Sequence, residues 1–78
     1  MNYWAEELAL MEAAAVRIES QEQDAERSFD LVFARAEAAG MPKQALTSQE
    51  FAGWMAARQD TDAAWGRWSL VMAAKPPA

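Results

Sequence analysis

A heptad repeat of small and apolar residues constrains the first half of this chain more than any other feature. Its members recur at alternating spacings of four and three, and residues 1–39 contain no glycine or proline. They are Trp4, Leu8, Met11, Ala15, Ile18, Glu22, Ala25, Phe29, Val32, Ala36 and Ala39. Such a repeat is typical of a long helix that packs one stripe of side chains against another helix, as in a coiled coil. We therefore expect one helix over residues 3–39.

A break in this helix near Ser20 is the alternative. Residues 19–27 contain a single apolar side chain, Ala25, and Ser20 with Gln23 would form a capping box at the start of a new helix. We favour the continuous helix because neither glycine nor proline interrupts the segment.

A glycine and a proline end the first helix. Gly40 suits the left-handed position just beyond a helix, and Pro42 cannot continue one. Thr47 with Glu50 three residues later then reads as a capping box that starts the next helix. The connecting loop is expected to span residues 40–46.

The second half of the chain carries its own stripe at helical spacing, which predicts a helix over residues 47–74. The members of the stripe are Phe51, Trp54, Arg58, Thr61, Trp65, Trp68 and Met72. The sequence Asp-Thr-Asp at residues 60–62 would also cap a new helix beginning near Ala63. The two long helices are therefore alternatively broken into three or four.

Composition and the short loop together predict the fold class. Alanine supplies 19 of the 78 residues, and most of the rest are also strong helix formers, so the chain is expected to be all-α. A short loop between two long helices implies an antiparallel helical hairpin. Residues 1–75 would form a single helical domain, and residues 76–78 an extended tail after Pro76. A chain this small buries little surface, so we expect it to complete a bundle by oligomerisation, as a dimer.

The register of the hairpin decides which side chains stay uncovered. Pairing Ala36 with Phe51 across the loop makes the numbers of facing residues sum to about 87. The first helix before about residue 13 then has no partner, because the second helix ends near Ala74. The predicted apolar overhang consists of Tyr3, Trp4, Leu8 and Met11. Contiguous exposed apolar patches mark interaction sites, so we predict that these residues bind a protein.

The residue inventory excludes several functions. The chain has no Cys and no His, so it lacks thiolate chemistry, the commonest general base and the usual zinc ligands. We expect no enzymatic activity, no cofactor and no metal site. A net charge of −5 opposes direct binding to nucleic acid or to an anionic membrane. The acidic start, MNYWAEE, is unlike a signal peptide and favours a cytoplasmic location.

The acidic residues gather in the first helix. Residues 1–39 hold nine acids and three bases, a net charge of −6, whereas residues 40–78 hold three acids and four bases, a net charge of +1. We add Glu12, Glu19 and Glu26 to the predicted protein-binding residues, because an acidic helix face steers association with a basic protein surface.

Two polar seam residues suggest a structural contact rather than chemistry. Glu22 lies in the first stripe and Arg58 in the second, and a partly buried ion pair between them would fix register. The other carboxylates of the first helix are expected to form a solvated stripe, since helical-bundle metal sites also use His.

These observations favour a small acidic non-enzymatic protein that acts by binding another protein, as an inhibitor, adaptor or chaperone. In size and acidity the chain resembles the small helical inhibitors that phages direct against host machinery. The acidic face of the first helix would suit a basic partner, such as a protein that handles nucleic acid. The alternative is a self-assembling structural subunit of a helical bundle.

Overall fold

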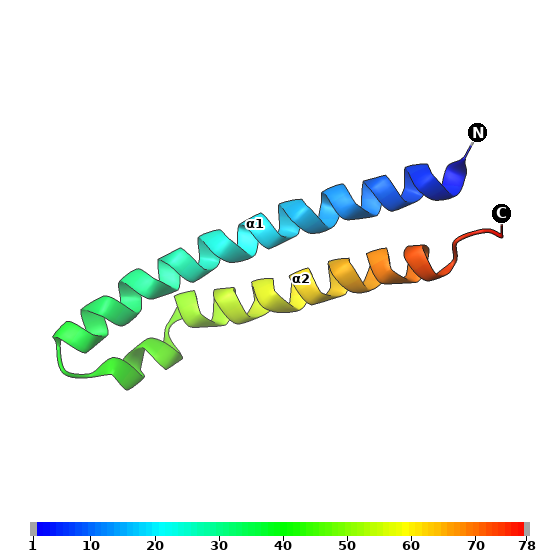
Figure 1. Ribbon diagram of the computed structural model, residues 1–78. Helices are drawn as coiled ribbons and strands as arrows, with labels where there is room; N and C mark the ends of the chain where they lie inside the picture. The colour runs from blue at the N-terminus through cyan, green and yellow to red at the C-terminus, as the bar shows by residue number, and fades with distance from the viewer. Residues whose placement is uncertain (1, 78) are drawn as a thin grey trace.

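Two long helices and one short helix make up the computed structural model, which describes residues 2–77. They are α1 (Tyr3–Ala38), the 3₁₀ helix η1 (Pro42–Thr47) and α2 (Gln49–Ala73), and residues 2–77 contain no strand. The all-α prediction is confirmed. The long helices lie side by side and run in opposite directions, so that both ends of the chain lie at the same end of the molecule (Figure 1). The structure measures 60 × 15 × 15 Å.

Both long helices are unbroken. α1 passes through Ser20, and α2 passes through residues 60–62, so the alternative of three or four shorter helices is wrong. Thr61 lies within α2, where its hydroxyl donates to the carbonyl of Ala57 at 3.1 Å and does not cap a new helix.

Gly40 ends α1 as the sequence predicts, and Asn2 caps its beginning. The side chain of Asn2 accepts a hydrogen bond from the N–H of Ala5 at 3.2 Å. At the other end, Gly40 has a φ of 75° and its N–H donates to the carbonyl of Glu37 at 3.0 Å. The next N–H, of Met41, donates to the carbonyl of Ala36 at 2.8 Å. These two bonds form a Schellman motif, in which the left-handed residue is normally glycine.

The connection is a short helix rather than the predicted loop over residues 40–46. The hydroxyl of Thr47 donates to the carbonyl of Gln44 at 2.9 Å within η1, so Thr47 is not the cap of α2. Ser48 caps α2 instead, because its hydroxyl oxygen accepts from the N–H of Phe51 at 3.1 Å. α2 therefore begins two residues later than expected.

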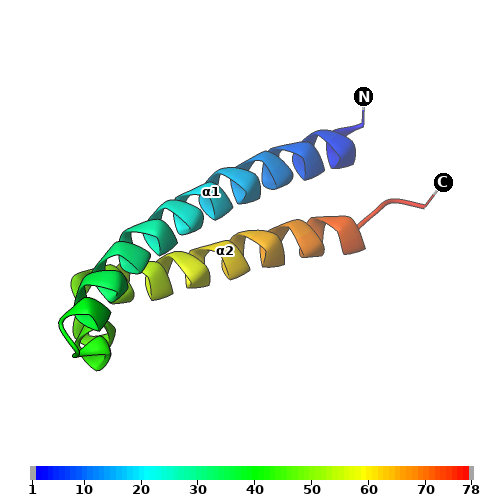
Figure 2. The same ribbon diagram turned by 60° about the vertical axis from the view of Figure 1, so that its left-hand side comes forward.

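The packing of η1 shifts the register between α1 and α2. η1 lies against the end of α1 in both views (Figures 1 and 2), and Ala45 within it is fully buried. The turn thus covers the last part of α1, so the first residues of α2 contact α1 at a point closer to the N-terminus of α1. The rings of Phe29 and Phe51 are 5.4 Å apart, whereas the sequence paired Phe51 with Ala36.

The apolar overhang that the sequence predicted does not exist. The indole N–H of Trp4 donates to the carbonyl of Val71 at 2.6 Å, and the ammonium of Lys75 lies 5.7 Å from the centre of the Trp4 ring. The residue numbers of this last pair sum to 79 rather than 87. The shift of about two helical turns lets α2 cover α1 almost to its first residue.

Small side chains mark the line where the helices approach each other. Ala15 is 0% exposed and Ala64 is 2% exposed, and the register that joins Trp4 to Lys75 also places these two alanines opposite each other. Every member of the predicted α1 stripe from its first residue to Ala36 is buried or half-buried, and Ala39 is exposed. On α2, Ala57 and Ala64 lie in the contact line, where the sequence analysis had placed Arg58 and Trp65.

The expected ion pair between Glu22 and Arg58 is not formed. In residues 2–77 the only ion pair joins Asp24 and Arg27, which are neighbours on the exposed side of α1. Arg58 is exposed, and its guanidinium carbon lies 5.8 Å from the centre of the Trp54 ring. The register change explains the difference, because it brings Glu22 opposite Ala57.

We predict that Ala15→Leu destabilises the protein by about 1–3 kcal/mol, because a larger side chain forces the two helices apart. Ala13→Leu is the matched control, since Ala13 lies two residues away on the same helix and is exposed. Urea unfolding followed by circular dichroism measures both. Equal stability of the two variants would contradict the close approach at Ala15.

Candidate partner-binding surfaces

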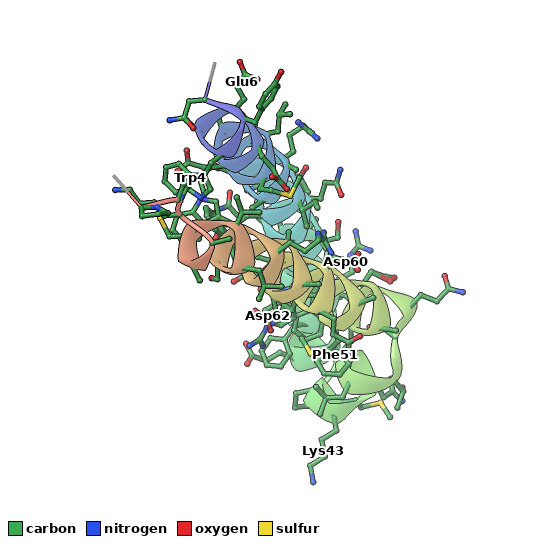
Figure 3. All side chains as sticks on the ribbon, turned by 90° about the vertical axis from the view of Figure 1, so that its right-hand side faces the viewer. Trp4, Glu6, Lys43, Phe51, Asp60 and Asp62 are labelled. Atoms are coloured by element: carbon green, nitrogen blue, oxygen red, sulfur yellow. The ribbon has the colours of Figure 1, made fainter. Side chains whose placement is uncertain are left out.

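The predicted apolar binding residues are divided between the inside and the outside of the helix pair. Trp4, Leu8 and Met11 are half-buried, and Trp4 lies between the two helices at the open end (Figure 3). Tyr3 is 70% exposed. Three of the four residues therefore stabilise the contact with α2, and only Tyr3 is freely available to a partner.

The predicted acidic residues form a row along one edge of α1. Glu12, Glu19 and Glu26 recur every seven residues, so they share a helix face over a length of about 21 Å. Glu12 and Glu26 are exposed, and Glu19 is half-buried. None of them forms an ion pair with another described residue. No ion pair among the described residues neutralises the row, which lies within a helix of net charge −6.

Exposed apolar residues near the open end were missed by the sequence analysis. Leu10 is 67% exposed and Leu70 is 73% exposed. Tyr3 and Leu10 are seven residues apart, so they share one face of α1 outside the stripe that contacts α2. The seven-residue spacing of Tyr3 and Leu10 indicates that they share a helix face. The binding residues were predicted mainly from the heptad stripe, to which Leu10 does not belong.

A cluster of aromatic rings holds the helices together near the turn. Phe29 of α1, 8% exposed, is the centre of the cluster. Its ring centre lies 5.1 Å from that of Trp54, with the planes stacked, and 6.1 Å from that of Phe33. Phe51 and Trp54 also meet edge to face at 6.4 Å. Offset and edge-to-face ring pairs of this kind stabilise a protein by more than the apolar area they bury would give.

A second aromatic contact lies further along α2. Trp65 and Trp68 meet edge to face, with ring centres 5.6 Å apart. Both side chains are half-buried, and the indole N–H groups of Trp54 and Trp68 are buried without a hydrogen-bond partner. The tryptophans thus act mainly as packing residues of the helix pair, and each still presents part of its ring to the surface.

The closed end of the molecule has a shallow open hollow. It is lined by the backbone turn and first residues of η1, from Gly40 to Gln44. Met41 and Leu46 are each about half exposed nearby, and Lys43 points away from the molecule at this end (Figure 3). No set of converging polar groups surrounds the hollow, so it offers little to orient a small ligand.

Two chemical properties of the described residues bear on function. Residues 2–77 contain no group of three or more acidic side chains placed to hold a metal ion. In the same residues, neither long helix combines the length and hydrophobicity that crossing a bilayer demands.

Comparison of the chain with protein-family models, with curated proteins and with solved structures finds no match.

We predict that Phe29→Ala lowers the free energy of unfolding by about 3–5 kcal/mol, because it removes the ring at the centre of the aromatic cluster. Phe33→Ala is the control, since Phe33 is 36% exposed and makes only the outermost ring contact. Thermal and urea unfolding measure the difference. A loss at Phe33 as large as that at Phe29 would mean that the cluster is not organised around Phe29.

Proposed function

We propose that the protein is a small non-enzymatic binding protein, which works as an antiparallel helical hairpin by docking onto another protein. The observation that carries this proposal is the amount of surface the chain leaves in water. The accessible area is 5781 Å², whereas the scaling for compact monomers gives about 4,700 Å² for 8.6 kDa. The difference is about 1,100 Å², and it reflects the elongated 60 × 15 × 15 Å shape.

The excess surface is partly apolar. No large side chain is fully buried among the described residues, and nine large apolar residues are exposed. A standard protein–protein interface covers about 800 Å² on each partner, so the excess is sufficient for one interface. A small chain without cysteine that leaves this much apolar surface in water gains stability when a partner covers part of it.

Charge supports a basic partner. α1 carries nine acids and three bases and is about 54 Å long, so it presents a rod of negative charge. Such a rod attracts a groove lined with lysine and arginine, of the kind that binds nucleic acid. We therefore propose that the protein acts as an inhibitor, adaptor or chaperone of a basic protein, with Glu12, Glu19 and Glu26 in the contact.

The exposed apolar residues at the open end lie apart from this contact. Leu10 and Glu12 are two residues apart in α1, so Leu10, together with Tyr3, lies roughly 160° around the helix from the acidic row. The contact proposed for the row therefore depends on charge, which mainly adds specificity and association rate.

We predict that the triple variant E12Q/E19Q/E26Q binds a lysine-rich helical peptide about tenfold more weakly than the native protein, because it removes the whole acidic row. The matched control is E6Q/E7Q/D24N, which changes the net charge equally but lies outside the row. Glu6 points away from α2 in Figure 3. Fluorescence anisotropy at low and moderate salt measures both.

The affinity of the control variant for the peptide is expected to fall by less than about threefold, because only the long-range effect of net charge is lost. Equal losses in the two variants would show that net charge, and not the row, attracts the peptide. No loss in either variant would contradict the proposal of a basic partner.

A further inference from the structure

A second stripe at heptad spacing runs along α2 beside the line that contacts α1. Its members are Phe51, Met55, Arg58, Asp62, Trp65, Ser69 and Met72. At 3.6 residues per turn, this stripe lies roughly 100° around α2 from the line through Thr61 and Ala64. Helices in four-helix bundles have two neighbours at about such an angle. α2 therefore has the pattern of a helix with two partners, of which the described chain supplies one.

The second stripe is only partly covered. Phe51, Met55 and Trp65 are half-buried, and Met72 is 38% exposed. Phe51 and Asp62 lie on one side of α2, while Asp60 lies on the other (Figure 3). Large apolar side chains at both ends of the stripe and charged residues in its middle thus share one accessible face.

The stripe is complementary to itself when a second copy runs antiparallel. With a two-fold axis beside residue 60, Met55 faces Trp65 of the second copy, and Arg58 faces Asp62 of the second copy. Each contact occurs twice. A parallel arrangement would instead set Arg58 against Arg58, where like charges oppose association.

Arg58 is available for such a contact. It forms no ion pair with another described residue, and its guanidinium lies over the Trp54 ring at the edge of the stripe. Asp62 is also exposed and unpaired among the described residues. An arginine and a carboxylate brought together at an interface make charge-assisted hydrogen bonds.

The corresponding face of α1 does not favour a second copy. Glu12, Glu19 and Glu26 lie there, and self-pairing of α1 would bring two acidic rows together. Charge therefore selects α2 as the contact and leaves α1 of each copy on the outside. About 800 Å² per copy is needed for a standard interface, which fits within the surface that the chain leaves exposed in excess.

We infer that two copies of the chain pair antiparallel along this face of α2, with Arg58 of each copy bonded to Asp62 of the other and with Met55 packed on Trp65. The stripe lies on α2 and the acidic row on α1, so the two proposed contacts share no residue. The pairing goes beyond the proposed docking onto another protein and does not depend on it.

Charge exchange at the centre of the interface tests the pairing. Sedimentation equilibrium of the full chain should give a species of twice 8.6 kDa at micromolar to millimolar concentrations. Arg58→Asp alone and Asp62→Arg alone should each weaken dimerisation at least about tenfold, since each places like charges in two contacts. The double variant R58D/D62R restores opposite charges and should return the dissociation constant to within about threefold of the native value.

Asp60→Arg is the matched control, because it changes the charge as Asp62→Arg does but on the other side of α2. It should leave dimerisation unchanged, and circular dichroism should show equal helicity in all variants. A native chain that stays monomeric overturns the inference. So does a dimer that the two single variants leave intact, or one that the double variant fails to restore.

The test of dimerisation can be distinguished from the test of the proposed partner binding. R58D/D62R keeps the acidic row, so it should bind the lysine-rich peptide as the native protein does. Loss of dimerisation without loss of peptide binding, or the reverse, assigns the failure to one surface alone.

Discussion

The packing of η1 against the end of α1 determines which residues of the two long helices meet. Ala45 is fully buried in this packing, and the Schellman bonds at Gly40 turn the chain into it. Because η1 covers the last turns of α1, α2 reaches back to Trp4, whose indole N–H binds the carbonyl of Val71. A tighter turn would have left the start of α1 uncovered. The register therefore decides which apolar residues stabilise the pair and which remain free.

The free surface follows from this register and from the two-helix architecture. Two helices bury one stripe each, and here Ala15 and Ala64 are almost completely buried in that line. Apart from the buried Phe29, the tryptophans and phenylalanines around the line are only partly covered. This arrangement leaves a second face on α2 and an acidic row on α1, and the two functional proposals are based on these separate surfaces.

The sequence predicted the contact stripe of α1 correctly, but it predicted the contact stripe of α2 only in part. The alternation of four and three found the inward residues of α1, because heptad spacing follows directly from helix geometry. On α2 it found Trp54, Thr61 and Trp68 in the contact line, but it also placed Arg58 and Trp65 there. Those two belong to the second stripe. Spacing could not separate the alternatives, because Ala57 and Ala64 fit the alternation of three and four between Trp54, Thr61 and Trp68 as well as Arg58 and Trp65 do.

The register, and with it the exposure of the apolar residues predicted to bind a partner, could not be read from the turn sequence. Nothing in residues 40–46 distinguishes an extended loop from a 3₁₀ helix that packs on α1, and that difference moves α2 by about two turns. The predicted overhang depended entirely on it, so Trp4, Leu8 and Met11 proved to be packing residues. The acidic row did not depend on register, because its spacing lies within one helix, and it remains a proposed contact.

Disulfide trapping tests the register most directly, since the chain has no cysteine of its own. The double variant A15C/A64C should form an intramolecular disulfide under mild oxidation, because the register places these positions opposite each other at the closest approach of the helices. The variant A15C/M72C, which pairs residues at a sum of 87, should remain reduced. Mass spectrometry of the monomer fraction under denaturing conditions distinguishes the two. Ready closure of A15C/M72C with failure of A15C/A64C would contradict the account.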